Sequence, residues 1–293
     1  MDIEPGDILR DTTPHPVPGV DGRYVAVIPE AWRVFYAFGG ATMATALRAA
    51  VAEVARPELS LRTADATFCQ AVPCGPVALQ VEVLRQGRTA AQALVRLWAI
   101  EHEDDAAGPV GNDLVVTCVL GEGREDSPYR FVGARFPEVP GPEESVPRAE
   151  ADDSPFARIP YHHQTEFRLT DPYLRRPDAP PGEPRASSWF RFRVPPLRED
   201  GTWEPATLAL PGDILGSAVH AGTGGGVGFF LVISLQISLH LLADTRADWL
   251  LQHTVAHHAG DGYASGTAEL WEPDGRLVAV ATQCAKLQPL DPG

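Results

Sequence analysis

The sequence predicts an α+β fold in which two tandem antiparallel sheets each wrap around a central helix. Three observations support it: a helical pattern followed by strand-like segments, a second such set later in the chain, and a constant spacing between the sets. The chain has 293 residues, enough for two domains of ordinary size. Its 44% hydrophobic and 22% charged residues are typical of a soluble globular protein.

The first set of elements ends near residue 120. Residues 23–28 alternate as a strand does, and Gly39-Gly40 then open a helix that Pro57 ends. The apolar residues of this helix recur at spacings that place them on one face: Met43, Leu47, Ala50, Val51 and Val54. Four strand-like segments follow at residues 63–71, 77–85, 90–100 and 113–120, and Gln86-Gly87-Arg88 is typical of a hairpin turn.

A segment rich in proline and acidic residues, 121–186, separates the two sets. It has few apolar runs, which predicts a linker that is wrapped on the surface or partly disordered. A loop of this length would be unusual inside one compact domain. We therefore expect an N-terminal domain at residues 1–120 and a C-terminal domain at residues 187–293 that carries the catalytic residues.

The second set begins with a strand at residues 187–194. Asp213 follows the Pro211-Gly212 break and begins a short helical pattern, which the glycine-rich residues 222–226 end. Four strand-like segments come next, at residues 229–242, 249–257, 262–271 and 276–287. Asp274-Gly275 is a strong hairpin signal between the last two.

A constant offset relates the two sets. Asp213 aligns with Gly40 (213 − 40 = 173), and the same offset aligns Gly260 with Gly87. It also aligns Leu270-Trp271 with Leu97-Trp98. Side-chain identity is slight, so the argument depends on pattern and spacing, which indicate a tandem duplication.

Charge and hydropathy exclude several classes of function. The net charge of −15 argues against a nucleic-acid partner, because phosphate binding needs a basic surface. The longest apolar run, 227–243, is shorter than the ~20 residues of a membrane-spanning helix and contains Ser234 and His240, so we expect a buried strand and no membrane contact. The acidic start of the chain does not resemble a signal peptide, which predicts a cytoplasmic protein.

The cysteines and histidines do not indicate a metal site. We expect the four cysteines to be reduced thiols, and Cys69 and Cys74 have no matching pair of Cys or His. Adjacent histidines, as at residues 162–163 and 257–258, would point to opposite faces of a strand. We therefore expect no metal and no cofactor.

Three polar side chains are candidates for chemistry. Asp213, at the start of a helical pattern, could be an N-cap or a catalytic base. Ser234 and Gln283 lie in otherwise apolar strands, where a buried hydroxyl or amide needs a hydrogen-bond partner. That partner is either the local backbone or a water molecule shared with Asp213, and the residues themselves leave both alternatives open.

Several short motifs occur in a characteristic order and spacing. The motifs in the first half are Gly39-Gly40, Cys74-Gly75-Pro76-Val77 and the run from Val81 to Arg88. Those in the second half are Asp213, the runs from Ser234 to His240, Trp249 to Leu251 and Gly275 to Ala279, and Gln283. The order and spacing of these motifs resemble the acyl-CoA thioesterase II family, whose fold is a double hotdog. The resemblance covers residues 23–120 and 187–288 and leaves the segment between them unmatched.

The resemblance implies an enzyme that hydrolyses a fatty acyl-CoA to free fatty acid and CoA. The family is understood to activate a water molecule with an Asp, a Thr or Ser, and a Gln. The corresponding residues here are Asp213, Ser234 and Gln283. One departure is Gln236, which stands where the family usually has an Asp after the Thr/Ser-Leu pair. This departure bears on substrate detail more than on reaction type.

Substrate contacts are expected at two further places. The N–H groups of Gly39 and Gly40, at a helix N-terminus, could hold the negative charge on the carbonyl oxygen. Arg88 could pair with a phosphate of CoA, although a solvated hairpin arginine is the alternative. Because Gly40 occupies the position of Asp213 in the other copy, we expect one active site per chain.

Two other functions stay open. Hotdog folds also host enoyl-CoA hydratases, but of the pattern Gly-Asp-x-Asn-Pro-x-His only Gly212-Asp213 is present, and His220 lies seven rather than five positions after Asp213 (220 − 213 = 7). The second alternative is a non-catalytic acyl-thioester-binding protein. In either case we expect a homo-oligomer, because open sheet edges are commonly covered by pairing.

Overall fold

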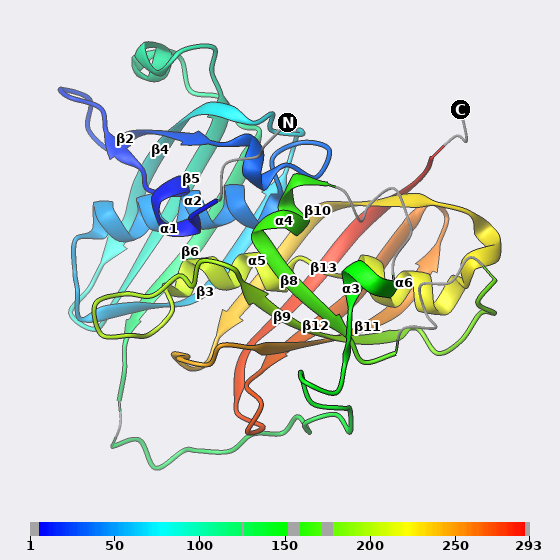
Figure 1. Cartoon of the computed structure of the whole chain (residues 1–293). Helices are drawn as coiled ribbons and strands as arrows, with labels where there is room; N and C mark the ends of the chain where they lie inside the picture. The colour runs from blue at the N-terminus through cyan, green and yellow to red at the C-terminus, as the bar shows by residue number, and fades with distance from the viewer. Residues whose placement is uncertain (1–5, 125, 152–158, 172–177, 291–293) are drawn as a thin grey trace.

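The computed structural model describes residues 6–124, 126–151, 159–171 and 178–290 (Figure 1). The strands of the first half are β1 (His15–Pro16), β2 (Arg23–Ile28), β3 (Leu59–Phe68), β4 (Gly75–Gln86), β5 (Ala90–Ala99) and β6 (Leu114–Glu122). Those of the second half are β7 (Val146–Pro147), β8 (Thr165–Leu169), β9 (Arg185–Phe192), β10 (Phe230–Leu241), β11 (Leu250–Gly260), β12 (Tyr263–Trp271) and β13 (Leu277–Pro289).

Short helices accompany one long helix, α2 (Gly39–Val54), which has 16 residues. The others are α1 (Ile8–Asp11), α3 (Arg148–Ala151), α4 (Pro160–Gln164), α5 (Ala209–Gly212) and α6 (Gly216–Thr223). Single 3-10 turns lie at η1 (Glu30–Trp32), η2 (Glu103–Ala107), η5 (Pro205–Leu208) and η6 (Gly225–Val227). Within the described ranges, no helix has the length and apolar character required to cross a membrane.

All described strands join one 13-stranded sheet in the order β1-β2-β4-β5-β6-β3-β10-β13-β12-β11-β9-β8-β7. The order of the second half mirrors that of the first, and the halves meet where β3 pairs antiparallel with β10. Asp65 and Ser238, which are 173 positions apart, face each other in that ladder. The offset found in the sequence therefore corresponds to a pseudo-twofold axis through this pair, and the predicted double hotdog is confirmed.

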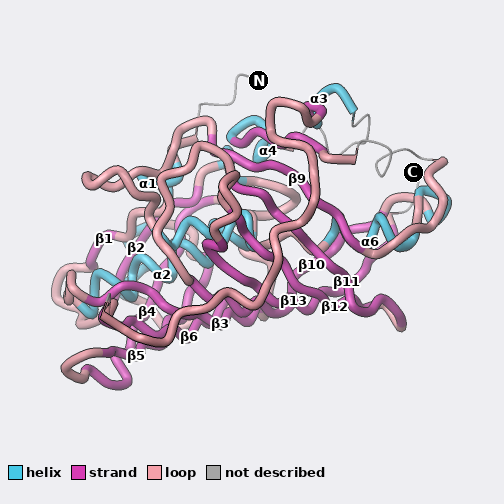
Figure 2. The backbone as a smooth tube through the Cα atoms, turned by 90° about the horizontal axis from the view of Figure 1, so that it is seen from below, coloured by secondary structure: helices cyan, strands magenta, loops and turns pink. Residues whose placement is uncertain are grey.

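Alternation of apolar and polar residues explains the strands. In β5 every second residue (Ala91, Ala93, Val95 and Leu97) is fully buried, and the residues between them are partly exposed. Such a strand has one face on the core and one face toward solvent. Helices α2 and α6 lie on the same side of the sheet (Figure 2), where α2 contacts β4, β5 and β6 and α6 contacts β9 and β11.

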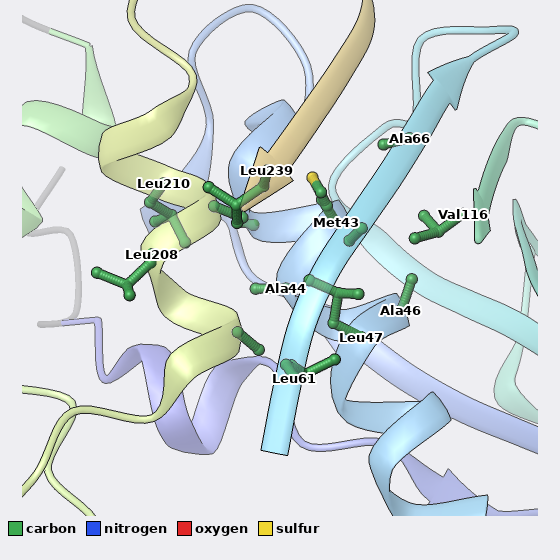
Figure 3. Packing of buried hydrophobic residues seen from close by; sticks show 14 of the residues in the cluster. Met43, Ala44, Ala46, Leu47, Leu61, Ala66, Val116, Leu208, Leu210 and Leu239 are labelled. Carbon is green, nitrogen blue, oxygen red and sulfur yellow. The ribbon is translucent and has the colours of Figure 1, made fainter. Parts of the chain in front are cut away.

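Helix α2 is the centre of the core in the first half. Its buried residues include Met43, Ala44 and Leu47, which Figure 3 shows between strand β3 and the chain around Leu208 and Leu210. The helix crosses the second half closely at Gly40, where a Cβ atom would lie 2.5 Å from the Cα of Leu210. Glycine at this position is therefore required by the contact between the two halves.

The segment 121–186 contains more structure than the linker expected from its composition. Strand β8 pairs with β9 from Thr165 opposite Phe192, and its residues alternate between buried and partly buried. Tyr161 and Gln164 of α4 are also buried. The linker prediction is wrong for this part of the range because a five-residue strand is too short to stand out among prolines and acidic residues. Residues 152–158 and 172–177 of the range lie outside the described residues.

The homo-oligomer was expected because open sheet edges are commonly covered by pairing, but the edges of this sheet are not open in that sense. The two outermost strands, β1 and β7, have two residues each, and each includes a proline. Short edge strands and proline are devices that prevent edge pairing. Association of chains through these edges is therefore not required by the fold, and the oligomeric state stays a prediction that sedimentation can test.

Candidate active site

The three side chains singled out in the sequence form one hydrogen-bonded cluster. The Ser234 hydroxyl donates to Oδ1 of Asp213 at 2.7 Å. The Gln283 amide donates to the same Oδ1 at 2.8 Å and to the Ser234 oxygen at 2.7 Å. Asp213 lies between α5 and α6, Ser234 in β10 and Gln283 in β13. The fold thus brings together residues that are 21, 49 and 70 positions apart in the chain.

A β-bulge in β10 directs Ser234 toward the other two side chains. In the β10–β13 ladder Ser234 lies opposite Ala285 and Ile237 lies opposite Gln283, with a register shift between Ser234 and Gln236. Residues three positions apart in a regular strand point to opposite faces. The extra residue of the bulge places Ser234 and Ile237 on the same face, that of Gln283.

The amide of Gln283 is held in one orientation. Its Oε1 atom accepts a hydrogen bond from the Leu215 backbone N–H at 3.1 Å. The Nε2 atom is therefore turned toward Asp213 and Ser234, and its two hydrogens serve both of them. Since the amide is buried and all these groups are satisfied, the cluster is rigid before any substrate binds.

Asp213 does not cap the helix that follows it in the chain. Helix α5 ends at Gly212 and α6 begins at Gly216, with Leu215 as its N-cap residue and no side-chain capping bond. The predicted helix start at Asp213 is wrong because the chain turns there, with φ −93° and ψ 71°. This geometry removes the N-cap alternative and leaves the carboxylate for the cluster.

The first half of the chain completes the surroundings of Asp213. The Gly40 backbone N–H donates a hydrogen bond to the Asp213 carboxylate. A Cβ atom at Gly39 would lie 2.7 Å from Oδ2 of Asp213, so only glycine leaves room for the carboxylate. The N-terminus of α2, with its partial positive charge, therefore faces the carboxylate directly. The site lies where the two halves of the chain meet.

Burial makes Asp213 more basic than an exposed aspartate. Loss of hydration raises the pKa of its carboxyl from 3.8 to about 6, and the hydrogen bonds from Ser234, Gln283 and the Gly40 N–H oppose part of this rise. A carboxylate with a pKa close to neutral can accept a proton from water and return it within one reaction cycle. The electrostatics of the site therefore suit a general base.

A cavity of about 380 Å³ opens beside the cluster, and Asp213, Ser234 and Gln283 form part of its wall. Both halves line it. Its aromatic lining residues are Phe35, Tyr36, Phe38, Phe68, Tyr161, Phe167 and Phe230. The volume and the apolar lining of this cavity are typical of a small-molecule binding site, in which a few polar groups fix the orientation of the ligand.

Gln236 and Arg88, which the sequence analysis also singled out, lie away from the cluster of Asp213, Ser234 and Gln283. Gln236 is adjacent to the buried Ile237 and so points to the outer face of the sheet, where it donates to the Ser238 hydroxyl at 2.7 Å. Ser238 in turn donates to Asp65. Arg88 is exposed in the turn after β4 and is not among the residues that line the cavity. Neither side chain contacts the cluster.

Residues of the segment between the two predicted domains also line the cavity, and the sequence did not indicate them. They are Arg148, Ile159, Tyr161, His162 and Phe167. A signal was present in the aromatic and histidine residues around Tyr161, which are uncommon in a polar linker. In the part of the chain that the structure describes, no group of three or more His, Cys, Asp or Glu residues could hold a metal ion.

Two family models match the chain. One is described as the acyl-CoA thioesterase N-terminal domain and matches residues 28–120. The other is described as the acyl-CoA thioesterase C-terminal domain and matches residues 142–286, a range that includes α4 and β8. No curated protein has a sequence that matches.

Solved structures share the fold over nearly the whole chain. A conserved protein with a hot dog fold from Alicyclobacillus acidocaldarius is 20% identical with TM-score 0.74, covering 97% of this chain and 98% of that one. A proposed thioesterase from Novosphingobium aromaticivorans is 29% identical with TM-score 0.71, covering 93% and 98%. The acyl-CoA thioesterase II TesB2 from Mycobacterium marinum is 20% identical with TM-score 0.71, covering 97% and 99%.

Proposed function

Because the chain belongs to the acyl-CoA thioesterase family and is a thioester hydrolase, we propose that it cleaves fatty acyl-CoA with a water molecule activated by Asp213. The observation that carries this proposal is the hydrogen-bonded cluster of Asp213, Ser234 and Gln283 in the wall of an apolar cavity. The cavity takes the acyl chain, and the cluster meets the thioester carbonyl at its polar end.

The reaction proceeds through a tetrahedral intermediate. Asp213 takes a proton from water while the water oxygen forms a bond to the thioester carbonyl carbon. The carbonyl electron pair moves to oxygen and returns as the C–S bond breaks. The departing CoA sulfur receives the proton from Asp213, and the fatty acid is released. Each atom is accounted for without a further reactant.

The other members of the cluster position the base. Ser234 and Gln283 both donate to Oδ1 of Asp213, and Oδ2 is the oxygen that lies against Gly39. Water bound near Oδ2 would stand beside the N-terminus of α2, whose N–H groups favour negative charge on the substrate carbonyl oxygen. The Gly39 N–H is therefore available to the substrate carbonyl oxygen, whereas the Gly40 N–H holds the Asp213 carboxylate.

The cellular setting that we propose is the cytoplasm. Cys69, Cys74, Cys118 and Cys284 are all free thiols, which supports a reducing compartment.

Release of free thiol from acyl-CoA tests the proposed function. A panel of saturated acyl-CoA thioesters of increasing chain length should show thiol release, with a preference for chains that fit the cavity. Loss of enoyl absorbance without thiol release would instead identify a hydratase. Binding of acyl-CoA without either reaction would identify a non-catalytic acyl-thioester-binding protein.

A further inference from the structure

The buried tyrosine of α4, Tyr161, has a hydroxyl group without a hydrogen-bond partner among the described residues. Its side chain is only 4% exposed and lines the cavity that contains Asp213. Its backbone is fixed, because its N–H donates to the Arg33 carbonyl at 3.1 Å and its carbonyl accepts from the Thr165 hydroxyl at 3.0 Å. Leaving a buried hydroxyl unsatisfied is unfavourable, so this group points to a ligand.

Aromatic contacts hold the ring of Tyr161 beside the N-terminus of α2. Its centroid lies 4.4 Å from that of Phe38, the residue that precedes Gly39 and occupies the N-cap position. Phe167 and Trp32 contact it at 6.1 Å and 6.5 Å. The ring therefore has one position, against the element whose N–H groups face Asp213.

The charge of Asp213 acts on this hydroxyl. Burial is the main cause that raises the pKa of Tyr161, and the negative charge of Asp213 raises it further, whereas the positive charge of Arg148 opposes the rise. The hydroxyl is thus protonated at neutral pH and can act as a donor.

Most of the donors nearest the reacting atoms are already engaged, and only the Gly39 N–H at the N-terminus of α2 has no partner among the described residues. Gly40 N–H, the Ser234 hydroxyl and both hydrogens of the Gln283 amide bind within the cluster. A thioester carbonyl needs donors that are free before it arrives, because negative charge develops on its oxygen.

We propose that the Tyr161 hydroxyl donates a hydrogen bond to the carbonyl oxygen of the bound thioester, beside the N-terminus of α2, and stabilises the oxyanion of the tetrahedral intermediate. Tyr161 would then be a catalytic residue supplied by the segment between the two sheets. This inference rests on the proposed thioesterase function.

The first test is Tyr161→Phe, which removes one oxygen atom and keeps the ring. We expect kcat to fall by roughly 10²-fold with KM little changed, because the hydrogen bond strengthens as charge develops. The matched control is Tyr24→Phe, which removes a hydroxyl that donates to Glu53 at 2.8 Å and lies outside the cavity. Unchanged kcat in Tyr161→Phe would overturn the inference.

A second test uses two inhibitors and does not depend on turnover. One is an acyl-CoA analogue with a ketone in place of the thioester, and the other is an S-alkyl-CoA without a carbonyl. Tyr161→Phe should bind the ketone at least several-fold more weakly than the wild type and bind the S-alkyl-CoA equally well. If Tyr161→Phe binds both ligands more weakly than the wild type by the same factor, the loss comes from a changed ring position and not from the carbonyl contact. If the variant binds both ligands as tightly as the wild type does, the hydroxyl does not touch the carbonyl. Either result overturns the inference.

The two proposals fail in different ways. If the wild type releases no thiol from any acyl-CoA, the proposed function is wrong and the inference falls with it. If the wild type releases thiol and Tyr161→Phe does so at the same rate, only the role of Tyr161 is wrong.

Discussion

Replacement of Asp213 by asparagine should make the folded protein more stable at neutral pH, although it should abolish activity. The carboxyl has a pKa of about 6 in the fold against 3.8 when exposed. One pKa unit corresponds to about 1.4 kcal/mol, so the ionised carboxylate costs the folded state about 3 kcal/mol at most. Asparagine carries no charge and does not incur that cost.

The sign of the pH dependence follows from the direction of the shift. Because the folded state binds the Asp213 proton more tightly than the unfolded state, the carboxyl destabilises the protein progressively as pH rises from about 4 to 6, and by a constant amount above that. The asparagine amide cannot accept the hydrogen bond from Gly40 through its nitrogen, but this loss does not vary with pH. The difference between pH values therefore isolates the carboxylate.

Urea denaturation of wild type and Asp213→Asn at pH 4 and pH 8 measures this effect. The free energy of unfolding of the variant, relative to wild type, should be about 2 kcal/mol higher at pH 8 than at pH 4. Asp104→Asn, an exposed position in η2, provides the control and should show no such change. A pH-independent difference for Asp213→Asn would refute the account of a desolvated base.

Three further outcomes are expected. The rate constant kcat/KM should rise with pH with a midpoint at about 6 and then reach a plateau, because Asp213 must be ionised to accept a proton. A profile that is flat between pH 5 and 8 would contradict this. Ser234→Ala and Gln283→Ala should each lower kcat. The double variant should be little worse than the poorer single variant, because both side chains hold the same oxygen atom of Asp213. Losses of kcat that multiply in the double variant would show independent roles. Gly40→Ala should destabilise the protein by roughly 3 kcal/mol in thermal or urea unfolding, because its Cβ would meet the Leu210 backbone, whereas Gly133→Ala, with nothing within 4 Å, should be neutral.

The duplicated fold was accessible from the sequence for physical reasons, whereas the three cluster residues were assigned together through the resemblance to a known family. Strands that are buried on one face alternate visibly, as β5 does, and a second copy at a constant offset repeats the pattern. Ser234 and Gln283 stood out because polar side chains within apolar strands need partners. Their residue types were informative without knowledge of the pairing.

Features that depend on pairing between distant segments could not be read in this way. The bulge that turns Ser234 toward Gln283 exists only in the ladder between β10 and β13, so nothing local in the sequence indicates it. Helix α4 and strand β8 are short, and their burial comes from contact with η1 and β9 rather than from their own pattern. The position of Tyr161 in the cavity was invisible for the same reason.

The destination of the solvent oxygen atom, either the fatty acid or the Asp213 carboxylate, tests the central claim most directly. A single turnover of acyl-CoA with excess enzyme in H₂¹⁸O distinguishes a water molecule activated by Asp213 from a covalent anhydride of Asp213 that water opens at the Asp213 carbonyl. Activated water puts ¹⁸O into the fatty acid and leaves Asp213 unlabelled, which is the result that we expect. Unlabelled fatty acid together with ¹⁸O in Asp213 would show a covalent acyl-enzyme anhydride and would contradict the mechanism.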